Sequence, residues 1–394
     1  MKSLNRIFAA LLSVSLVACT TPSTLTEVVP RLTSTTVLVT DIPKQTEPTA
    51  TDGNVTAIHD MLTDRAAHTA TLLPNGKVLI AGGFNGSGNS LSSAELFDPA
   101  SNMFLPTGPM SFARQSHTAT LLQNGKVLIA GGYGYNGEYL GSAELYDPLT
   151  GKFIPTGQIT IPRAGHIAAL LNNGKVLLAG GVGTDWTFLD SAELYDPNKN
   201  TFTLTGNMTF ARESHTATLL KDGKILVTGG HKGRRSSIII YSSAELYDPT
   251  SGLFTSTTSM LTERHKHDAV LLEDGRVLVV GGADARDDGG QYSSAEKYDP
   301  HTGIFTMAGN MNASRYKFQG TSVLLRTGKV LLIGGASVTE IYDPVTDTFS
   351  KVIDGLGMTR LFATATSLPD GKVILAGGYG TNISASANAW VFQP

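Results

Sequence analysis

Three kinds of side chain that could do chemistry recur along this chain at nearly constant spacing. An arginine returns about every 50 residues, a histidine follows it by three positions in five copies, and a glutamate lies further on. The arginines are Arg65, Arg114, Arg163, Arg212, Arg264, Arg315 and Arg360; the histidines are His68, His117, His166, His215 and His267; the glutamates are Glu95, Glu144, Glu193, Glu245, Glu296 and Glu340. A ring of such charges could bind an anionic ligand, and a ring of imidazoles could bind a metal.

A structural role explains these repeated positions better than a ligand site. A scaffold repeats its contacts in every unit, whereas few ligands have the symmetry of a repeat. We therefore expect Arg114 and Glu144 to form a buried ion pair, repeated in the other units. Phe318 and Ala363 replace the histidine in the last two units, which favours packing over metal binding. No nucleophile–base pair or phosphate-binding loop is present, so the sequence predicts no catalytic residue, no metal and no cofactor.

The elements that must position these residues are short strands. A typical unit carries an apolar run, an Asn-Gly or Asp-Gly turn, a second apolar run ending in Gly-Gly, and a third strand ending at Asp-Pro. The sixth unit has Thr327-Gly328 at the turn, and the seventh ends without Asp-Pro. In the second unit the Gly-Gly pair is Gly131-Gly132, and six other units carry the same pair. Four strands per unit and seven units predict an all-β, seven-bladed propeller with four antiparallel strands per blade.

The repeated sequence of these units resembles the kelch repeat. That family is marked by a double glycine followed by Tyr and Trp at fixed separation; here Gly131-Gly132 is followed by Tyr146 and Phe153, so Phe replaces Trp. The resemblance covers residues 54–394 and implies a propeller like the central domain of galactose oxidase. The copper chemistry of that enzyme needs a Tyr–Cys crosslink on the propeller, and the single cysteine of this chain is Cys19. The resemblance therefore implies a relative without the copper site.

The seventh unit lacks its outer strand, because the chain ends at its third strand, Trp390 to Phe392. Alignment of the units places Val55 at the position that Phe occupies elsewhere. We therefore expect residues near 54–60 to complete the last blade, which would hide two sheet edges at once.

The N-terminal region is interpreted as a signal peptide followed by a tether. Residues 1–18 have a basic start and an apolar run too short to span a membrane, which is typical of a signal peptide. Leu16 to Cys19 resembles a bacterial lipobox, so Cys19 is predicted to be lipidated. Thr20 follows it, which favours the outer membrane if the host is Gram-negative. Residues 19–53, rich in Thr and Pro, are predicted to be a tether, with a short strand possible at 36–40.

The net charge of the chain indicates which classes of partner to expect. The formal net charge is −3, so nothing points to a nucleic-acid partner. We expect a monomeric protein in the cell envelope, attached to the membrane through its lipid.

The segments after Gly-Gly vary most between units and should meet partners at one face of the propeller. They supply a candidate ligand-binding set of aromatic and charged residues: Tyr133, Tyr135, Tyr139, Trp186, Phe188, His231, Arg234, Arg235, Tyr241, Asp287, Tyr292 and Tyr379. Several of these aromatic residues could equally fold inward, and the charges could simply pair with one another in solvent.

Three functions remain open on these residues. The first is a binding module for a glycan or protein ligand, which needs only aromatic and mixed-charge residues. The second is a carbohydrate-active enzyme, such as a sugar epimerase or mutarotase, which should gather carboxylates and histidines over the channel mouth. The third is an architectural part of a larger envelope complex.

Overall fold

A computed structural model describes residues 51–394 of the chain, and residues 50–394 form one compact unit. The predicted signal peptide, Cys19, the tether up to residue 50 and the possible strand at 36–40 lie outside the described residues. Within residues 51–394 the only helices are three single 3₁₀ turns, and no helix is long and apolar enough to cross a membrane.

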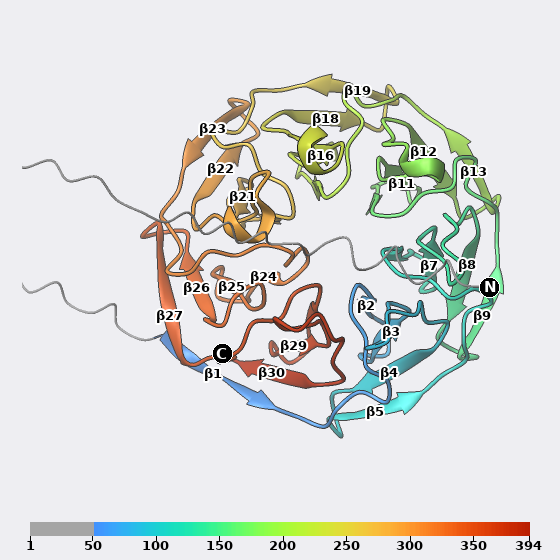
Figure 1. Ribbon diagram of the computed structural model, residues 1–394, viewed down its shortest axis with the longest axis horizontal. Helices are drawn as coiled ribbons and strands as arrows, with labels where there is room; N and C mark the ends of the chain where they lie inside the picture. The colour runs from blue at the N-terminus through green and yellow to red at the C-terminus, as the bar shows by residue number, and fades with distance from the viewer. Residues whose placement is uncertain (1–50) are drawn as a thin grey trace, which may run out of the picture. The chain divides into compact units, whose positions relative to one another are not determined.

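The described chain folds into seven four-stranded antiparallel blades arranged in a ring (Figure 1), which confirms the predicted all-β propeller. Blades 1 to 3 are β2 (Thr69–Leu72), β3 (Val78–Ala81), β4 (Ala94–Asp98) and β5 (Met103–Pro106); β6 (Thr118–Leu121), β7 (Val127–Ala130), β8 (Ala143–Asp147) and β9 (Lys152–Pro155); β10 (Ile167–Leu170), β11 (Val176–Ala179), β12 (Ala192–Asp196) and β13 (Thr201–Leu204). Blades 4 and 5 are β14 (Thr216–Leu219), β15 (Ile225–Thr228), β18 (Ala244–Asp248) and β19 (Leu253–Ser256); β20 (Asp268–Leu271), β21 (Val277–Val280), β22 (Ala295–Asp299) and β23 (Ile304–Met307). Blades 6 and 7 are β24 (Ser322–Leu324), β25 (Val330–Leu332), β26 (Glu340–Asp343) and β27 (Thr348–Asp354); β28 (Thr364–Ser367), β29 (Val373–Ala376), β30 (Ala389–Gln393) and β1 (Thr51–Ala57).

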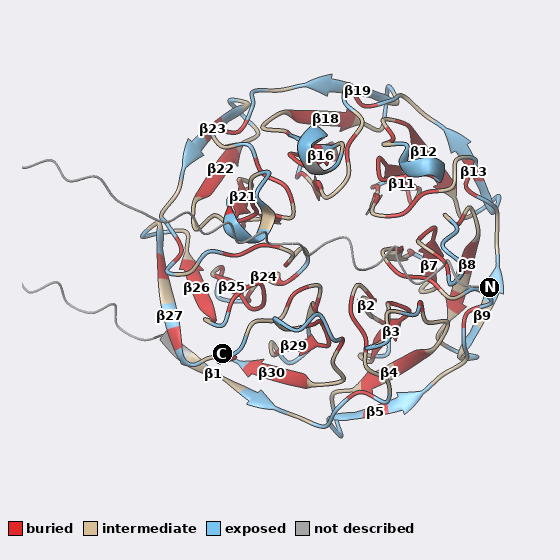
Figure 2. Ribbon diagram, viewed as in Figure 1, coloured by how far each residue is buried: buried red, intermediate tan, exposed pale blue. Residues whose placement is uncertain are grey.

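Burial follows the position of each strand within its blade. The second strand, such as β7, is buried along its whole length, as its continuous apolar sequence predicts. The outer strands carry most of the exposed residues (Figure 2), and the first strands lie innermost, where those of neighbouring blades contact one another.

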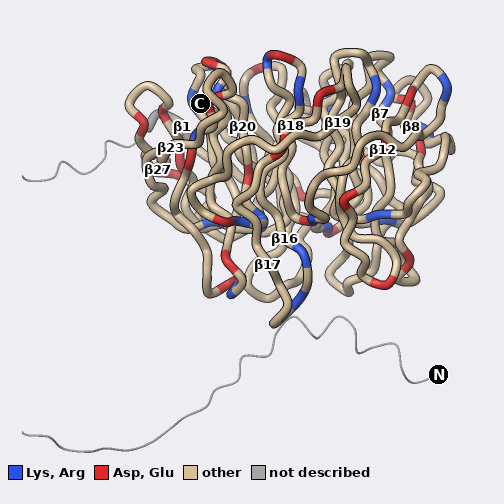
Figure 3. The backbone as a smooth tube through the Cα atoms, turned by 90° about the horizontal axis from the view of Figure 1, so that it is seen from above, with Lys and Arg blue, Asp and Glu red and all other residues tan. Residues whose placement is uncertain are grey.

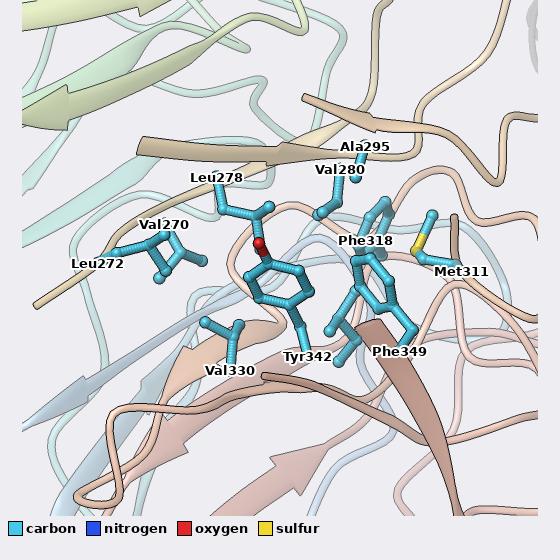
Figure 4. Close-up of a cluster of buried hydrophobic side chains, with 11 residues drawn as sticks. Val270, Leu272, Leu278, Val280, Ala295, Met311, Phe318, Val330, Tyr342 and Phe349 are labelled. Atoms are coloured by element: carbon cyan, nitrogen blue, oxygen red, sulfur yellow. The ribbon is translucent and has the colours of Figure 1, made fainter. Parts of the chain in front are cut away.

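The hydrophobic core is divided into layers between neighbouring blades. Figure 4 shows one layer, in which Leu278 and Val280 of blade 5 pack against Phe318, Tyr342 and Phe349 of blade 6. Each blade is therefore stabilised by its two neighbours, as expected of a repeat protein.

The ring is closed by β1, as the strand count predicts. β1 pairs antiparallel with β30, and Val55 lies opposite Phe392. The strand begins at Thr51, three residues before the expected boundary at 54. It also pairs in parallel with β27 of blade 6, which the sequence did not predict, so blades 6 and 7 form one eight-stranded sheet.

The ring has two different faces. The turn face carries the Asn/Asp-Gly and Asp-Pro turns, and the loop face carries the segments after Gly-Gly and those joining one blade to the next. The longest loop-face excursion is the hairpin of β16 (His231–Lys232) and β17 (Ile239–Ile240), which projects from the end of the ring opposite the C-terminus (Figure 3).

Candidate functional site

The repeated arginines and glutamates form buried ion pairs within blades 1 to 6. Nη2 of Arg114 lies 3.0 Å from Oε1 of Glu144, with both side chains at most 1% exposed. Nη1 of Arg114 also donates to the carbonyl oxygens of Gly131 and Ser142, and Glu144 accepts the backbone N–H of Ser111. These side chains tie the loop-face segments of a blade together, and their burial keeps them out of reach of a ligand. In blade 7 the guanidinium of Arg360 instead lies over the ring of Trp390, which stands where the other blades have Glu.

The glycine pair lets neighbouring blades approach closely. Gly131 has φ 63°, and a Cβ there would lie 2.5 Å from the carbonyl oxygen of Arg163 and 2.9 Å from the ring of His166. Gly132 has φ 106°, and a Cβ would lie 2.8 Å from the carbonyl oxygen of Gln115. Gly131 therefore lies where the next blade packs closely, and Gly132 lies against Gln115 of its own blade, in agreement with a structural role.

The recurring histidines link blades through hydrogen bonds to threonine. Nε2 of His166 lies 3.0 Å from Oγ1 of Thr118 in the preceding blade. Equivalent contacts are His117–Thr69, His68–Thr364 and His267–Thr216. Where Phe318 replaces the histidine, the preceding blade has Asp268 in place of the threonine, and this carboxylate accepts backbone N–H groups instead. Residues 51–394 contain no group of three His, Cys, Asp or Glu side chains placed to hold a metal ion.

A collar of backbone hydrogen bonds surrounds the loop-face end of the innermost strands. It is made by the residue two positions after each repeated arginine, and all seven have positive φ: Ala67, Ser116, Gly165, Ser214, Lys266, Lys317 and Phe362. Six N–H···O bonds of 2.8–3.1 Å join successive members around the ring. The collar fixes the backbone on which the loop-face side chains stand, and it places Lys266 and Lys317 side by side.

Three predicted aromatic residues meet on blades 2 and 3. The rings of Tyr133 and Tyr139 lie 5.3 Å apart, and Tyr139 lies 6.0 Å from Trp186, both in edge-on contacts. Trp186 lies in η2 (Thr184–Trp186) and is 41% exposed, and the guanidinium of Arg234 lies over its ring. Tyr135 is 64% exposed. These residues form an aromatic strip on the loop face.

Three other predicted aromatic residues lie elsewhere. Tyr241 and Tyr292 pack over Arg212 and Arg264 of their own blades, so their rings shield the buried ion pairs. Tyr379 is only 6% exposed and packs with Tyr316 and Leu361. These three side chains fold inward.

The remaining predicted residues converge on blades 3 to 5. Phe188 contacts the ring of His231 edge-on at 5.6 Å. Nδ1 of His231 lies 3.2 Å from Nδ1 of His265, and Nε2 of His265 lies 3.4 Å from Oδ1 of Asp287. Lys266 binds both carboxylate oxygens of Asp287 at 2.6 and 2.8 Å. We call His231, His265, Lys266 and Asp287 the imidazole cluster. The side chain of Arg235, in η3 (Arg235–Ser237), is outside the described part of the structure.

Burial and charge set the protonation of this cluster. Burial, followed by the neighbouring His265, lowers the pKa of His231 to about 3, so that this imidazole is neutral at neutral pH. Burial also lowers the pKa of His265, although the carboxylate of Asp287 opposes the shift. Burial acts to raise the pKa of Asp287, but hydrogen bonds from His265 and the charge of Lys266 outweigh it, and the net pKa lies below the usual range.

Three further loop-face residues escaped the sequence analysis. Glu213 lies beside His231 through a backbone bridge, and burial raises its pKa. Tyr316 donates a hydrogen bond to Asp288, and Lys317 lies over the ring of Tyr316. All three directly follow a repeated arginine by one or two positions. These positions also vary from unit to unit. They therefore carried a signal that the sequence analysis missed by considering only the segments after Gly-Gly.

The charges of units four and five do not form a single patch. Arg264 is buried with Glu296, and Arg286 pairs with Asp284 in solvent. Among these charges, His231, His265, Lys266 and Asp287 come together through contacts of their side chains. Two shallow hollows of residues 51–394 lie on the turn face, between the turns of neighbouring blades; one is lined by Arg326, Asp370 and Gln393.

Comparison with known proteins agrees with this architecture. The family model of the KLHDC2/KLHL20/DRC7 Kelch-repeats domain matches residues 49–230. Among solved structures 1108 chains match; one is a fungal alcohol oxidase of the AA5 family in complex with copper, with a TM-score of 0.67, 16% identity, and coverage of 87% of this chain and 76% of that chain. A search of curated protein sequences finds no match.

The fold defines the class as a seven-bladed β-propeller. The double glycines, the Tyr–Phe spacing and the family-model match over residues 49–230 support a kelch-repeat propeller. At 16% identity the oxidase shares the fold alone.

Proposed function

We propose that the protein is a cell-envelope lipoprotein whose propeller serves as a binding module for glycan or protein ligands on its loop face. The observation that carries this proposal is the adjacency of the aromatic strip on blades 2 and 3 to the imidazole cluster on blades 4 and 5. Aromatic rings next to hydrogen-bonding groups suit a sugar ring or the anchor residues of a protein partner.

Exposed apolar side chains extend this surface outward. Phe112 is 49% exposed and Phe210 41% exposed, and both lie in segments that join one blade to the next on the loop face. Leu62 and Leu261 occupy neighbouring positions in two other blades and are 57% and 61% exposed. The loop face thus presents apolar contact area as well as polar groups, which favours binding over a purely solvated surface.

The lipid anchor that we propose is at Cys19, and the described chain enters the propeller at the turn face. Asn54 near the start of β1 lies opposite Gln393 at the end of β30, so the chain enters at the turn face. The loop face is at the other end of the ring. Replacement of Cys19 by Ser should release the protein from membranes; membrane retention equal to that of the wild type would rule out lipidation.

The binding proposal is tested with the full chain on an array of neutral and acidic glycans, alongside recovery of protein partners from envelope extracts. Trp186→Ala and Tyr135→Ala should each weaken binding about tenfold or more, because both side chains are exposed on the aromatic strip. The matched control is Leu149→Ala on the turn face, where the side chain is 96% exposed and should not affect binding. Loss of binding with all three variants, or with none, would contradict a loop-face site.

A carbohydrate-active enzyme is the second candidate, and one observation favours it. The contact of His231, His265 and Asp287 is a carboxylate–histidine convergence of the kind that acid–base catalysis uses. A glycan that binds the full chain should then be converted, which NMR spectra of the glycan would show. A glycan that is recovered unchanged after long incubation identifies a binding module.

A further inference from the structure

The imidazole cluster has a proton arrangement that its contacts dictate. The two Nδ1 atoms of His231 and His265 lie 3.2 Å apart, so one must carry a proton and the other must accept it. On the other side of its ring, Nε2 of His265 is buried, faces the carboxylate of Asp287 at 3.4 Å, and has no better-aligned partner among residues 51–394.

Only one pair of neutral tautomers satisfies both contacts. If Nδ1 of His265 carried the proton, its Nε2 would turn a lone pair toward the carboxylate of Asp287, which is repulsive. If Nε2 of His265 carries the proton, it donates to Asp287, and its Nδ1 accepts from Nδ1–H of His231. The chain of bonds then runs from His231 through His265 to Asp287. Lys266 binds both carboxylate oxygens and holds Asp287 in place.

This arrangement leaves a lone pair on Nε2 of His231. The side chain of His231 is 7% exposed, and its Nε2 has no hydrogen-bond partner within residues 51–394. Unlike Nε2 of His265, this atom is not fully enclosed by the protein. The ring is fixed by Phe188 at 5.6 Å and by the backbone pairing of His231 with Ile240. Nε2 of His231 is therefore a neutral hydrogen-bond acceptor with a fixed position, exposed to solvent beside an aromatic surface.

We infer that His231 is the polar anchor of the loop-face site and that its Nε2 accepts a hydrogen bond from a hydroxyl group of a neutral, sugar-like ligand ring. This inference rests on the proposed binding function of the loop face. His265 and Asp287 act as positioning residues, because they hold the tautomer without touching the ligand. An acidic sugar whose carboxylate met His231 would be disfavoured, since an anion has no proton to donate to this lone pair.

The tautomer is tested first, without any ligand. The full chain labelled with ¹⁵N only at histidine gives signals from 9 rings, and long-range ¹H–¹⁵N spectra separate protonated from unprotonated ring nitrogens. His231 should be unprotonated at Nε2 and protonated at Nδ1, and His265 should be protonated at Nε2. Asp287→Asn should disturb this pattern in both rings. A protonated Nε2 of His231 in the wild type would overturn the inference.

The ligand class is tested with neutral hexose oligosaccharides and their uronic-acid counterparts as probes. His231→Phe keeps an aromatic ring but removes the acceptor, and should weaken binding of the neutral probes about tenfold or more. His231→Gln retains an acceptor oxygen and should recover part of that loss. Asp287→Asn should weaken binding by a smaller factor, because it changes the tautomer rather than the contact.

The outcomes separate this inference from the proposed function. Neutral glycan binding that His231→Phe leaves unchanged overturns the inference and leaves the binding function standing. Preference for the uronic-acid probes also overturns it. If the wild type binds none of the glycans, the glycan form of the proposed function fails and the inference fails with it. Thermal unfolding of each variant shows whether it is folded.

Discussion

Nε2 of His166 and Oγ1 of Thr118 lie 3.0 Å apart across the boundary between blades 2 and 3. Blades 3 and 4 lack the equivalent bond, because Ile167 stands where Thr118 does and no partner for Nε2 of His215 is found in the described residues. The repeated histidines therefore join neighbouring blades in pairs and do not act as one ring.

Thr118→Val should destabilise the protein by about 1 kcal/mol, because it removes one part-buried hydrogen bond and leaves Nε2 of His166 without a partner. Thr120→Val is the matched control. It makes the same change in the same strand, at a residue whose hydroxyl forms no side-chain hydrogen bond within residues 51–394, and should change stability little. Urea unfolding of both variants measures the difference; equal losses would show that the hydrogen bond contributes nothing.

The buried ion pair should be far more sensitive to substitution than a surface pair. Glu144→Gln leaves the guanidinium of Arg114 buried without its counter-charge, and we expect a loss of about 3–5 kcal/mol. Lys126→Met in the same blade breaks a pair between Lys126, which is 35% exposed, and Asp147, which is 16% exposed. This change should cost about 0–1 kcal/mol. A comparable loss from the two variants would contradict a structural role specific to the buried pair.

The close approach at the double glycine gives a third prediction. Gly131→Ala adds a Cβ that would lie 2.5 Å from the backbone oxygen of Arg163, so the neighbouring blade must shift. Gly88→Ala has the same sign of φ, at 79°, but a Cβ there meets nothing within 4 Å. Gly88→Ala should therefore cost about 1 kcal/mol from backbone strain alone, and Gly131→Ala several times as much. Thermal unfolding of the pair separates strain from collision.

Most of the fold could be predicted because its signals are local. An Asn-Gly turn, an Asp-Pro strand end and a Gly-Gly pair each dictate a backbone conformation from two residues, and the seven Gly-Gly pairs fix the number of blades. Closure by β1 followed from counting strands. The parallel pairing of β1 with β27 could not be predicted, because it depends on how two blades meet and has no repeated signal.

The site could be predicted only in part, because it is made by loops from different blades. His231 and Asp287 stood out as breaks in the repeat, but their connection through His265 depends on the packing of blades 4 and 5. Sequence patterns also could not separate exposed Tyr135 from inward-facing Tyr379, since both follow a Gly-Gly pair. Loop conformation decides which way each ring points.

Acid should unfold the propeller through its buried histidines. Burial lowers the pKa values of His68 and His215 from 6.5 to about 3 in the folded protein. Between these values the unfolded chain binds a proton at each ring and the folded chain does not. The stability that depends on these two neutral rings is therefore fully present above pH 6.5 and is lost as the pH drops toward 3. Each ring should contribute a slope of about 1.4 kcal/mol per pH unit in this window.

His68→Phe tests this account, because Phe318 shows that the position accepts a phenyl ring. The variant loses the hydrogen bond to Thr364, which should cost about 1 kcal/mol at any pH. Its stability should nevertheless fall less steeply between about pH 7 and pH 5 than that of the wild type, because one proton-binding ring is gone from the unfolded state. If the stability of the variant and of the wild type, measured by urea unfolding, falls equally with pH, His68 is protonated in the folded protein. Other groups would then control acid unfolding, such as the carboxylates of Asp98 and Asp147, which pair with Lys77 and Lys126.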